Sequence, residues 1–420
     1  MKKIRIGIMG AARGSSYIHS SHNIEEAELV AVCDFYKPAL DRCRDMAEKF
    51  GLYGVAYYMD FEEFLQHDMD AVILANYAHQ HAPYAIRILD SGKHVMSECL
   101  TCATMKEAVE LIEAVERSGK IYAYAENACF TEKRLEMRER YRRGDIGDLM
   151  YAECEYVHDC SVDSANYWHL LTYGQRDHWR NQAYSTFYCT HSMGPVLYIT
   201  GLRPVKVSGF ETQNKPYMRN LGSAAGIGAV EMVTLENGAL LKSLHGGLKR
   251  HVYNPFHIAG DKGIMCEKEN GELHVYIETE PCKWGEAEEY YPEVRNKFSL
   301  DAGHGGGDFY ELHFFFRAIL GDKEALAQCI DVYMAVDMCI PGILAYRSIC
   351  NGNISIDIPN LRDPKERDAY RNDTFCSFPD IAGDMWVPNN IHDTTPIPDS
   401  VYDEVRKLWE DWLAENGSKR

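Results

Sequence analysis

The chain has 420 residues, of which 46% are hydrophobic and 25% are charged, and its formal charge is −19. This length exceeds the usual single domain of roughly 100–200 residues, so we expect two globular domains and no long disordered segment. The negative charge disfavours nucleic acid and anionic membranes as partners and suits a neutral substrate, although acidity of this size also serves solubility alone.

The beginning of the chain, MKKIRIGIMGAARG, enters a strand pattern with no apolar segment and cleavage site before it. We therefore expect a cytoplasmic protein. No segment approaches the roughly 20 apolar residues of a membrane span, so we expect no membrane partner. The 14 cysteines are scattered, as is typical of reduced thiols, and neither the lone pair Cys99 and Cys102 nor the 17 histidines have spacing that predicts a metal site.

Residues 1–126 alternate between apolar runs and helical patterns. The runs that predict strands are 3–9, 29–33, 70–75, 94–97 and 121–125. Helical patterns follow Tyr17 and cover 82–89, and Thr104 and Glu107 form a T-x-x-E capping box before a helix that ends at Gly119. This alternation predicts an α/β fold with a doubly wound parallel sheet, the Rossmann arrangement.

The pattern changes after residue 126. Longer, more alternating strands are expected at 149–157, 205–212, 229–235, 239–245 and 257–259. Helical patterns at 130–143, 192–200, 308–320 and 331–348 are expected to cover one face, and Pro341 is expected to kink or split the last helix. We predict a second α/β domain over 127–358 with an open, mainly antiparallel mixed sheet, followed by a surface extension over 359–420.

The turn after the first strand has the residues of a dinucleotide-binding loop. The run from Gly10 through Ala12 and Arg13 to Gly14 consists mostly of small residues, which let backbone N–H groups approach a pyrophosphate. The run departs from the strict G-x-G-x-x-G pattern. Asp34 ends the second strand, where a carboxylate accepts hydrogen bonds from ribose hydroxyls and repels a 2′-phosphate. The alternative is that Asp34 is only a turn residue. The pattern favours NAD as the cofactor.

Four segments resemble the glucose-fructose oxidoreductase, inositol dehydrogenase and rhizopine-catabolism (Gfo/Idh/MocA) family of Rossmann enzymes. They are IGIMGAARG, AVCDFYKPAL, ANYAHQHAPYAIRILDSGKHVMSE and RRGDIGDLMYAECEYVHD. The resemblance spans roughly residues 3–359. It implies that Asn76 and His79 lie along the cofactor and that Glu98 and Cys99 lie near its nicotinamide end. Because Cys99 stands where the family has a catalytic lysine, the usual proton relay of a sugar dehydrogenase is in doubt.

Two further segments are similar to a glycoside hydrolase branch of this family, the NAD-dependent α-N-acetylgalactosaminidases. In FYCTHSMGPVLYITG, Tyr188 and His191 match the tyrosine and histidine of that branch's Y-P-T-H-G-L-G-P signature, and residues 303–308 resemble its G-H-G-G-x-D run. That branch also lacks the lysine. The resemblance implies hydrolysis without net use of NAD: oxidation at sugar carbon 3, elimination of the aglycone, addition of water and re-reduction.

Such chemistry needs groups that move protons near neutral pH. The candidate catalytic residues are His191, Tyr188 and Tyr253, and the candidate substrate-binding residues are Trp179, Arg180 and His304. Each has a plainer alternative. His191 can be a core histidine that caps the next helix, Tyr188 a core aromatic residue, and Tyr253 part of a solvated basic turn, while Trp179 and Arg180 can serve packing alone.

The sequence thus predicts an NAD-dependent glycosidase acting on a carbohydrate or glycoside. The first alternative is a net sugar or glycoside 3-dehydrogenase. The second is a non-catalytic NAD sensor, in which the altered residues 98–100 mark lost activity. Because family members commonly associate through the open face of the second-domain sheet, the resemblance also implies a homodimer or homotetramer.

Overall fold

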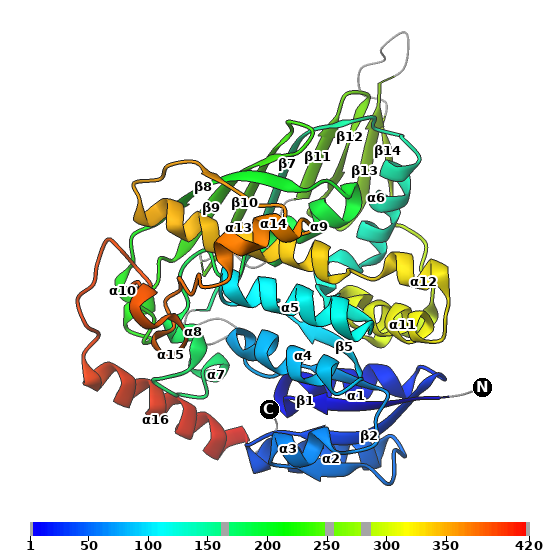
Figure 1. Ribbon diagram of the computed structural model, residues 1–420, viewed down its shortest axis with the longest axis vertical. Helices are drawn as coiled ribbons and strands as arrows, with labels where there is room; N and C mark the ends of the chain where they lie inside the picture. The colour runs from blue at the N-terminus through cyan, green and yellow to red at the C-terminus, as the bar shows by residue number, and fades with distance from the viewer. Residues whose placement is uncertain (1–2, 161–167, 248–255, 279–286, 417–420) are drawn as a thin grey trace. The chain divides into compact units, whose positions relative to one another are not determined.

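The computed structural model describes residues 3–160, 168–247, 256–278 and 287–416 (Figure 1). The chain forms two compact units, the first made of residues 1–135 and 293–336 and the second of residues 136–292 and 337–419. These limits differ from the predicted domain limits, since residues 293–336 join the N-terminal unit rather than the second one.

The first unit contains a parallel sheet, described with six strands in the order β3-β2-β1-β4-β5-β6. The strands are β1 (Ile4–Met9), β2 (Ala27–Cys33), β3 (Ala56–Tyr58), β4 (Ala71–Leu74), β5 (His94–Glu98) and β6 (Tyr122–Ala125). Strand order reverses between β1 and β4, so the carboxyl ends of these two strands form the topological switch point where such sheets bind ligands. The predicted doubly wound parallel fold is confirmed.

Five helices connect these strands: α1 (Ala11–His22), α2 (Lys37–Lys49), α3 (Phe61–Leu65), α4 (His81–Asp90) and α5 (Met105–Ser118). Helix α1 begins directly after Gly10, six residues before the predicted start, because the small residues of the loop are themselves helical. The predicted start and stop of α5 are confirmed. The Thr104 hydroxyl accepts a hydrogen bond from the Glu107 backbone, and Gly119 ends the helix with φ 61°.

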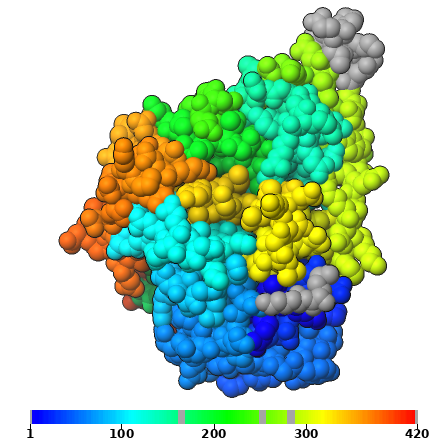
Figure 2. All heavy atoms as spheres, turned by 45° about the vertical axis from the view of Figure 1, so that its right-hand side comes forward, coloured from blue at the N-terminus to red at the C-terminus, as the bar shows by residue number. Residues whose placement is uncertain are grey.

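The late segment of the first unit packs against its first helix. It contains the 3₁₀ turns η3 (Lys297–Asp301) and η4 (His304–Gly306) and the helices α11 (Gly307–Ile319) and α12 (Lys323–Gln328), and α11 contacts α1. Figure 2 shows the yellow surface of this segment against the blue surface of the N-terminal residues. Side-chain pairs between α1 and α11, described below, hold the two parts of this unit together.

The second unit contains a mixed sheet, described with nine strands in the order β14-β13-β12-β11-β7-β10-β9-β8-β15. Its strands are β7 (Leu149–Val157), β8 (Pro204–Glu211), β9 (Gly228–Leu235), β10 (Leu240–Gly246), β11 (Phe256–Gly260), β12 (Gly263–Glu267), β13 (Leu273–Ile277), β14 (Glu288–Tyr290) and β15 (Ile356–Asp357). Strands β7 and β10 pair in parallel and the other described pairs are antiparallel. The predicted mainly antiparallel sheet is confirmed.

Helix α9 (Thr190–Thr200) packs on β7 and β10 of this sheet. The other helices that begin after residue 130 are α6 (Glu132–Arg142), α7 (Trp168–Leu171), α8 (Trp179–Gln182), α10 (Pro216–Arg219), α13 (Val332–Cys350), α14 (Pro364–Arg367), α15 (Pro379–Ala382) and α16 (Asp399–Asn416). Helix α13 runs through Pro341 without being split. Two side chains form hydrogen bonds with backbone carbonyls of this helix. The Thr186 hydroxyl donates to the carbonyl of Gly342, and the Cys189 thiol donates to the carbonyl of Met338.

Among the described residues, the helical stretch Lys323–Cys350, which contains α12 and α13, is the one that is long and apolar enough to cross a membrane. This differs from the expectation that no segment approaches such a length. However, 78% of its most apolar window is buried inside the protein, and the core helix of a globular protein meets the same criterion.

The C-terminal segment is more than a surface extension. Arg367 and Phe378 are only 2% and 1% exposed, and Phe378 packs edge-on against Phe187 with 5.1 Å between ring centroids. The Ser377 hydroxyl and the Asn389 amide donate to the carbonyls of Gln182 and Asn181 on helix α8. The prediction of a surface wrap was wrong for this part, because its Pro- and Asp-rich composition concealed a few residues that complete the core of the second unit.

Candidate functional site

The loop between β1 and α1 is shaped for close approach of a ligand. Gly10 has φ 96°, and a Cβ there would lie 2.3 Å from the carbonyl carbon of Ala75, so only glycine fits. A Cβ on Gly14 would lie 2.5 Å from Ile8, which lets α1 pack closely on β1. The N-cap residue Gly10 has no side chain that could cap α1. The N–H of Ala11 is bound by Asp34, so the N–H groups of Ala12 and Arg13 are the ones available to an anion. Ala12 lies in this first turn.

Asp34 lies directly after β2 and holds this loop. Its Oδ2 accepts a hydrogen bond from the Ala11 backbone at 2.7 Å, and its Oδ1 accepts from the Tyr36 backbone at 2.8 Å. Burial raises the pKa of Asp34, while these two hydrogen bonds oppose the rise. Each oxygen keeps a further lone pair, so the role in turn structure and the predicted contact with ribose hydroxyls are compatible.

The side chain of Asn76, which follows β4, is the clearest indication that this edge of the sheet binds a ligand. Its side-chain oxygen and nitrogen are both buried and have no hydrogen-bond partner among the described residues. A buried amide without partners costs free energy unless a ligand or water satisfies it. His79 lies on the next turn, stacked on Tyr77, and burial lowers its pKa to about 4, so its imidazole is neutral at neutral pH.

Arg13 takes part in an ion-pair cluster rather than pointing to a phosphate. Its guanidinium donates to both oxygens of Asp308 at 2.8 Å and to Glu98 Oε1 at 2.5 Å. The arginine holds the pKa of the Asp308 carboxyl well below its usual range. His304 Nδ1 lies 2.9 Å from Asp308, so this predicted substrate residue belongs to the same cluster of the first unit. The carboxylates of Asp308 and Glu98 thus neutralise the guanidinium of Arg13, the one cationic side chain of the loop.

Tyr17 connects this cluster to a buried acid. Its hydroxyl lies 2.5 Å from Glu98 Oε1 and 2.8 Å from Glu311 Oε1. A phenol has one proton and can donate to only one of two carboxylates, so the other contact requires a proton on a carboxyl group. Burial and the charge of Asp308 raise the pKa of Glu311 well above the usual value, so we expect Glu311 to carry this proton.

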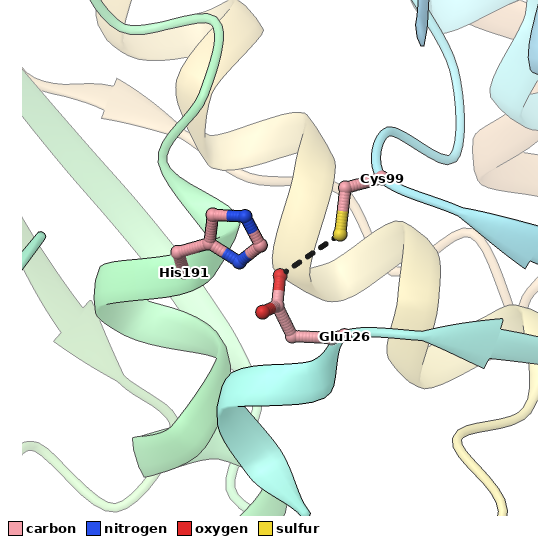
Figure 3. A group of neighbouring side chains, drawn as sticks. All are labelled: Cys99, Glu126 and His191. Carbon is pink, nitrogen blue, oxygen red and sulfur yellow. Dashed lines mark hydrogen bonds between the residues drawn. The ribbon is translucent and has the colours of Figure 1, made fainter. Parts of the chain in front are cut away.

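Cys99 and Glu126 lie at the ends of the neighbouring strands β5 and β6. The Cys99 thiol points to the Glu126 carboxylate and donates to its Oε2 at 3.2 Å (Figure 3). Burial and the charge of Glu126 raise the pKa of Cys99 well above the usual value for a thiol. This thiol stays protonated and cannot replace the amine of a catalytic lysine as a proton shuttle at neutral pH.

The residues of the first unit fit a dinucleotide. The glycine-only turn at Gly10, the uncapped α1 N-terminus, the carboxylate of Asp34 and the unpartnered amide of Asn76 all lie at the carboxyl edge of the sheet around its switch point. Of the predicted cofactor residues, Arg13 and Glu98 bind each other in the described structure.

The second unit has a cavity of about 190 Å³ with aromatic walls. Those walls are formed by Tyr156, Trp168, Trp179, Tyr184, Phe187 and Tyr188. Its polar lining includes Arg180, His158, Ser185 and His245. The predicted substrate residues Trp179 and Arg180 and the predicted catalytic residue Tyr188 therefore line one pocket. Mainly apolar walls with a few convergent polar groups are typical of small-molecule sites.

His191, on the first turn of α9 (Figure 3), packs against two residues that line this pocket. Its ring centroid lies 4.4 Å from that of Tyr156 and 4.8 Å from that of Tyr188, and the residue is 8% exposed. The Tyr188 and His191 pair is thus in direct contact at the helix entrance, as its spacing predicts. Tyr253 lies outside the described residues.

Sequence reasoning missed the buried acids of both units. Glu231 is fully buried on the inward face of β9, and its Oε1 lies 3.4 Å from His245 Nδ1 on β10. An inward charge in an alternating strand was the available signal. Glu126 directly follows a buried strand at the edge of the sheet where ligands bind, which was also visible in the sequence. Asp308 ends the 303–308 run that the sequence singled out, but its pairing with Arg13, 295 residues away, gave no signal in the sequence.

Comparison with known proteins agrees with this geometry. Residues 4–126 match the model of the Gfo/Idh/MocA oxidoreductase family with its NAD-binding Rossmann fold, and residues 230–365 match the C-terminal domain of glycosyl hydrolase 109. The chain is similar to an alpha-N-acetylgalactosaminidase of Shewanella oneidensis, at 25% identity over 86% of this chain and 85% of the relative. It is also similar to an alpha-N-acetylgalactosaminidase of Tannerella forsythia, at 26% identity over 85% and 86% of the two chains.

Solved structures share the fold. A levoglucosan dehydrogenase in complex with NADH and levoglucosan superimposes with a TM-score of 0.68 at 17% identity, covering 86% of this chain and all of the other. An aldose-aldose oxidoreductase of Caulobacter crescentus gives a TM-score of 0.67 at 16% identity, covering 85% of this chain and all of the other. With a dinucleotide-shaped loop, residues 4–126 that match the Gfo/Idh/MocA family and residues 230–365 that match the C-terminal domain of glycosyl hydrolase 109, this protein is similar to the glycosyl hydrolase 109 branch of that family.

Proposed function

We propose that this protein is an NAD-dependent glycosidase that cleaves a glycoside through transient oxidation of the sugar. The observation that carries the proposal is the side chain at position 99. A sugar dehydrogenase of this family needs a proton-accepting amine there, whereas this chain has a buried thiol with a raised pKa that donates to Glu126. Two homologues of similar length are named as alpha-N-acetylgalactosaminidases, which supports hydrolysis.

Bound NAD supplies the reversible removal of hydride from sugar carbon 3. The chain supplies orientation and proton transfer. Trp179 and Tyr188 offer ring faces on which a sugar can stack, and the Tyr188 phenol belongs to the pocket lining. We assign proton transfer at the sugar to Tyr188 Oη, with His191 as the adjacent group that accepts and returns the proton. The chemistry requires that the sugar in this pocket meets the nicotinamide bound by the first unit.

A panel of aryl glycosides tests the proposal. The protein with a catalytic amount of NAD is expected to release nitrophenol from at least one α- or β-glycoside, including the N-acetylgalactosaminide, without lasting absorbance of reduced nicotinamide. In deuterated water, deuterium is expected at carbon 2 of the released sugar. Release that occurs equally well after complete removal of NAD contradicts the proposal.

Substitutions in the pocket separate catalysis from packing. Tyr188→Phe is expected to lower turnover by about 10²–10⁴, the usual value of a positioned acid or base. The matched control is Tyr184→Phe, which removes another phenol from the same pocket and leaves turnover within a fewfold. Equal losses in the two variants contradict the role of Tyr188.

The alternative function is a net sugar or glycoside 3-dehydrogenase, which the oxidoreductase fold of the structural neighbours favours. In that case reduced nicotinamide accumulates in proportion to a keto-sugar product. We further propose a cytoplasmic homodimer or homotetramer, and a monomer in light scattering contradicts the oligomer.

A further inference from the structure

We propose that the pocket of the second unit binds a sugar that carries an anionic group, a carboxylate or a sulfate, and that Arg180 recognises this group. The inference rests on the proposed function, because it names the class of sugar that the same site accepts. It goes beyond that function, since neither the redox chemistry nor the similarity to the homologues requires a charged substrate.

Arg180 is held in place by aromatic rings instead of by carboxylates. Its guanidinium carbon lies 4.4 Å from the ring centroid of Trp179 and 5.8 Å from that of Tyr188, and all three residues line the pocket. Within the described part of the chain, no carboxylate forms an ion pair with Arg180. Stacking uses the face of a guanidinium and leaves its N–H groups at the edge available for a planar anion.

This environment differs from that of three other partly buried arginines. Arg13 binds Asp308 through two hydrogen bonds, Arg140 binds Glu288, and Arg347 binds both oxygens of Asp373 at 2.7 Å. In a chain with 63 acidic and 44 basic side chains, carboxylate partners are abundant. An arginine that lines a cavity without such a partner therefore indicates a position where the ligand provides the negative charge.

The described lining of the pocket contains no aspartate or glutamate. Two buried acids contact residues of the lining without being part of it. Glu231 lies 3.4 Å from His245, whose Nε2 contacts the carbonyl of Ser185, and Glu211 accepts from the Ser185 hydroxyl at 2.6 Å. Burial raises the pKa of Glu211. A negative ligand group thus meets Arg180 and His158 and no opposing carboxylate on the wall.

The size of the cavity limits the rest of the ligand. About 190 Å³ is less than the roughly 300–1,000 Å³ of pockets for drug-sized molecules, so the space suits one sugar ring. The ring faces of Trp179 and Tyr188, which stack at 27° to one another, can pack on its apolar side. A carboxylate or sulfate on the ring edge would then reach the guanidinium edge for paired hydrogen bonds.

Binding measurements without chemistry test the proposal. The full-length protein is titrated with three matched methyl glycosides, a hexuronide, a hexoside 6-sulfate and the neutral hexoside, by calorimetry or by quenching of tryptophan fluorescence. Both acids are expected to bind about ten- to a hundredfold more tightly than the neutral sugar, the usual range for a hydrogen-bonded charge. The preference is expected to fall as salt rises. Preference for one acid only identifies carboxylate or sulfate as the source of the charge.

Two variants assign the effect to Arg180. Arg180→Gln is expected to abolish the preference for acids while it leaves neutral-sugar binding within a fewfold, and Arg180→Lys is expected to keep part of it. The matched control is Arg176→Gln, an exposed arginine of the same unit that pairs with Asp399, and it is expected to keep the full preference. If Arg180→Gln does not fold, the proposal is tested by the preference of the wild type for acidic sugars and by the salt dependence of that preference.

The outcomes separate this inference from the proposed function. Equal binding of neutral and acidic sugars by the wild type overturns the inference, as does a preference that survives Arg180→Gln. NAD-dependent release from neutral aryl glycosides alone overturns it as well, while the glycosidase function stands. Preferential binding of acidic sugars with no release from any aryl glycoside overturns the glycosidase function and leaves the pocket assignment in place.

Discussion

At the scale of single residues, the cofactor loop depends on one glycine. Gly10→Ala is expected to destabilise the first unit and to abolish NAD binding, because φ 96° is unfavourable for alanine and its Cβ would overlap the Ala75 carbonyl. The measurement is a thermal melt with and without NAD. The control is Gly92→Ala, which has φ 83° but nothing within 4 Å of its Cβ, so it isolates the conformational cost of about 1–2 kcal/mol. Similar losses in both variants contradict the steric argument.

The shared phenol of Tyr17 leads to a second prediction. Glu311→Gln is expected to preserve folding and NAD affinity, because a glutamine amide can donate to Tyr17 as the protonated carboxyl does. The folded-state pKa of Glu311 is raised, so its contribution to stability is present at low pH and is lost as pH rises towards that value. The variant should therefore resist alkaline destabilisation better than the wild type.

Infrared spectroscopy checks the protonation directly. The wild type is expected to show the carbonyl stretch of protonated, buried carboxylic acids near neutral pH. Glu311→Gln is expected to lower the intensity of this band without abolishing it, because Glu107, with a pKa of about 7, also contributes. Glu324→Gln, on the exposed helix α12, provides the control and should leave the intensity unchanged. An unchanged band in Glu311→Gln means that another group carries the proton.

How much of the site the sequence predicts depends on the distance between partners. The turn at Gly10 and the place of Asp34 beside it follow from the sequence, because loop, helix and strand are neighbours along the chain. The sequence predicts a cofactor role for Arg13 but not its pairing with Asp308, which lies on a helix 295 residues later. Periodicity and motifs do not carry such pairings, so the ion-pair cluster appears only in three dimensions.

At the scale of elements, helix α5 contains a testable cap. Glu107 Oε2 accepts from the Ala103 backbone at 2.7 Å, and burial raises the pKa of Glu107 to about 7. Its contribution to stability is complete below the unfolded value near 4.5 and is lost as pH rises to about 7. Glu107→Gln keeps an acceptor without the charge, so the melting temperature is expected to decline less between these pH values. Glu113→Gln, on the same helix and not among the charges that shift the pKa of Glu107, should leave the profile unchanged.

Element boundaries were predicted best where a cap or a strict alternation marks them. The strand β7 has the predicted limits, and α5 begins and ends at its predicted capping residues. The strands β12, β13 and β14 were missed because they are short, with five, five and three residues. Helix α13 shows a different case. Pro341 predicts a kink or a split, but the helix continues from Val332 to Cys350 without a split, and most of its residues are buried.

At the scale of the whole molecule, fold class followed from the sequence while the division into units did not. Alternating strands and helices predict the first sheet, and longer alternating strands predict the second. Residues 293–336 join the first unit through the Arg13 and Asp308 pair and the contact of α11 with α1. Composition does not predict that residues 293–336 belong to the first unit, because their pattern is that of an ordinary helical segment of the second domain.

The C-terminal segment leads to the last prediction. A chain ending at residue 398 lacks helix α16, in which Val405 is the one buried residue, so the second unit is expected to remain folded. A chain ending at residue 358 also lacks Phe378, whose removal alone is comparable to a Phe→Ala change that costs about 3–5 kcal/mol. It further lacks the side chains that bind the Asn181 and Gln182 carbonyls of α8, the helix that carries Trp179 and Arg180.

Hydrogen exchange distinguishes the two truncations. In the chain ending at 358, the amides of α8 and of the adjoining turn to α9 are expected to lose protection, and sugar binding should disappear. The Rossmann sheet should keep its protection and its affinity for NAD, because the residues removed all belong to the second unit apart from the final arginine. Full protection of α8 in that chain would mean that residues 359–420 are not needed to hold α8 in place. Loss of NAD binding would mean instead that the two units do not fold independently.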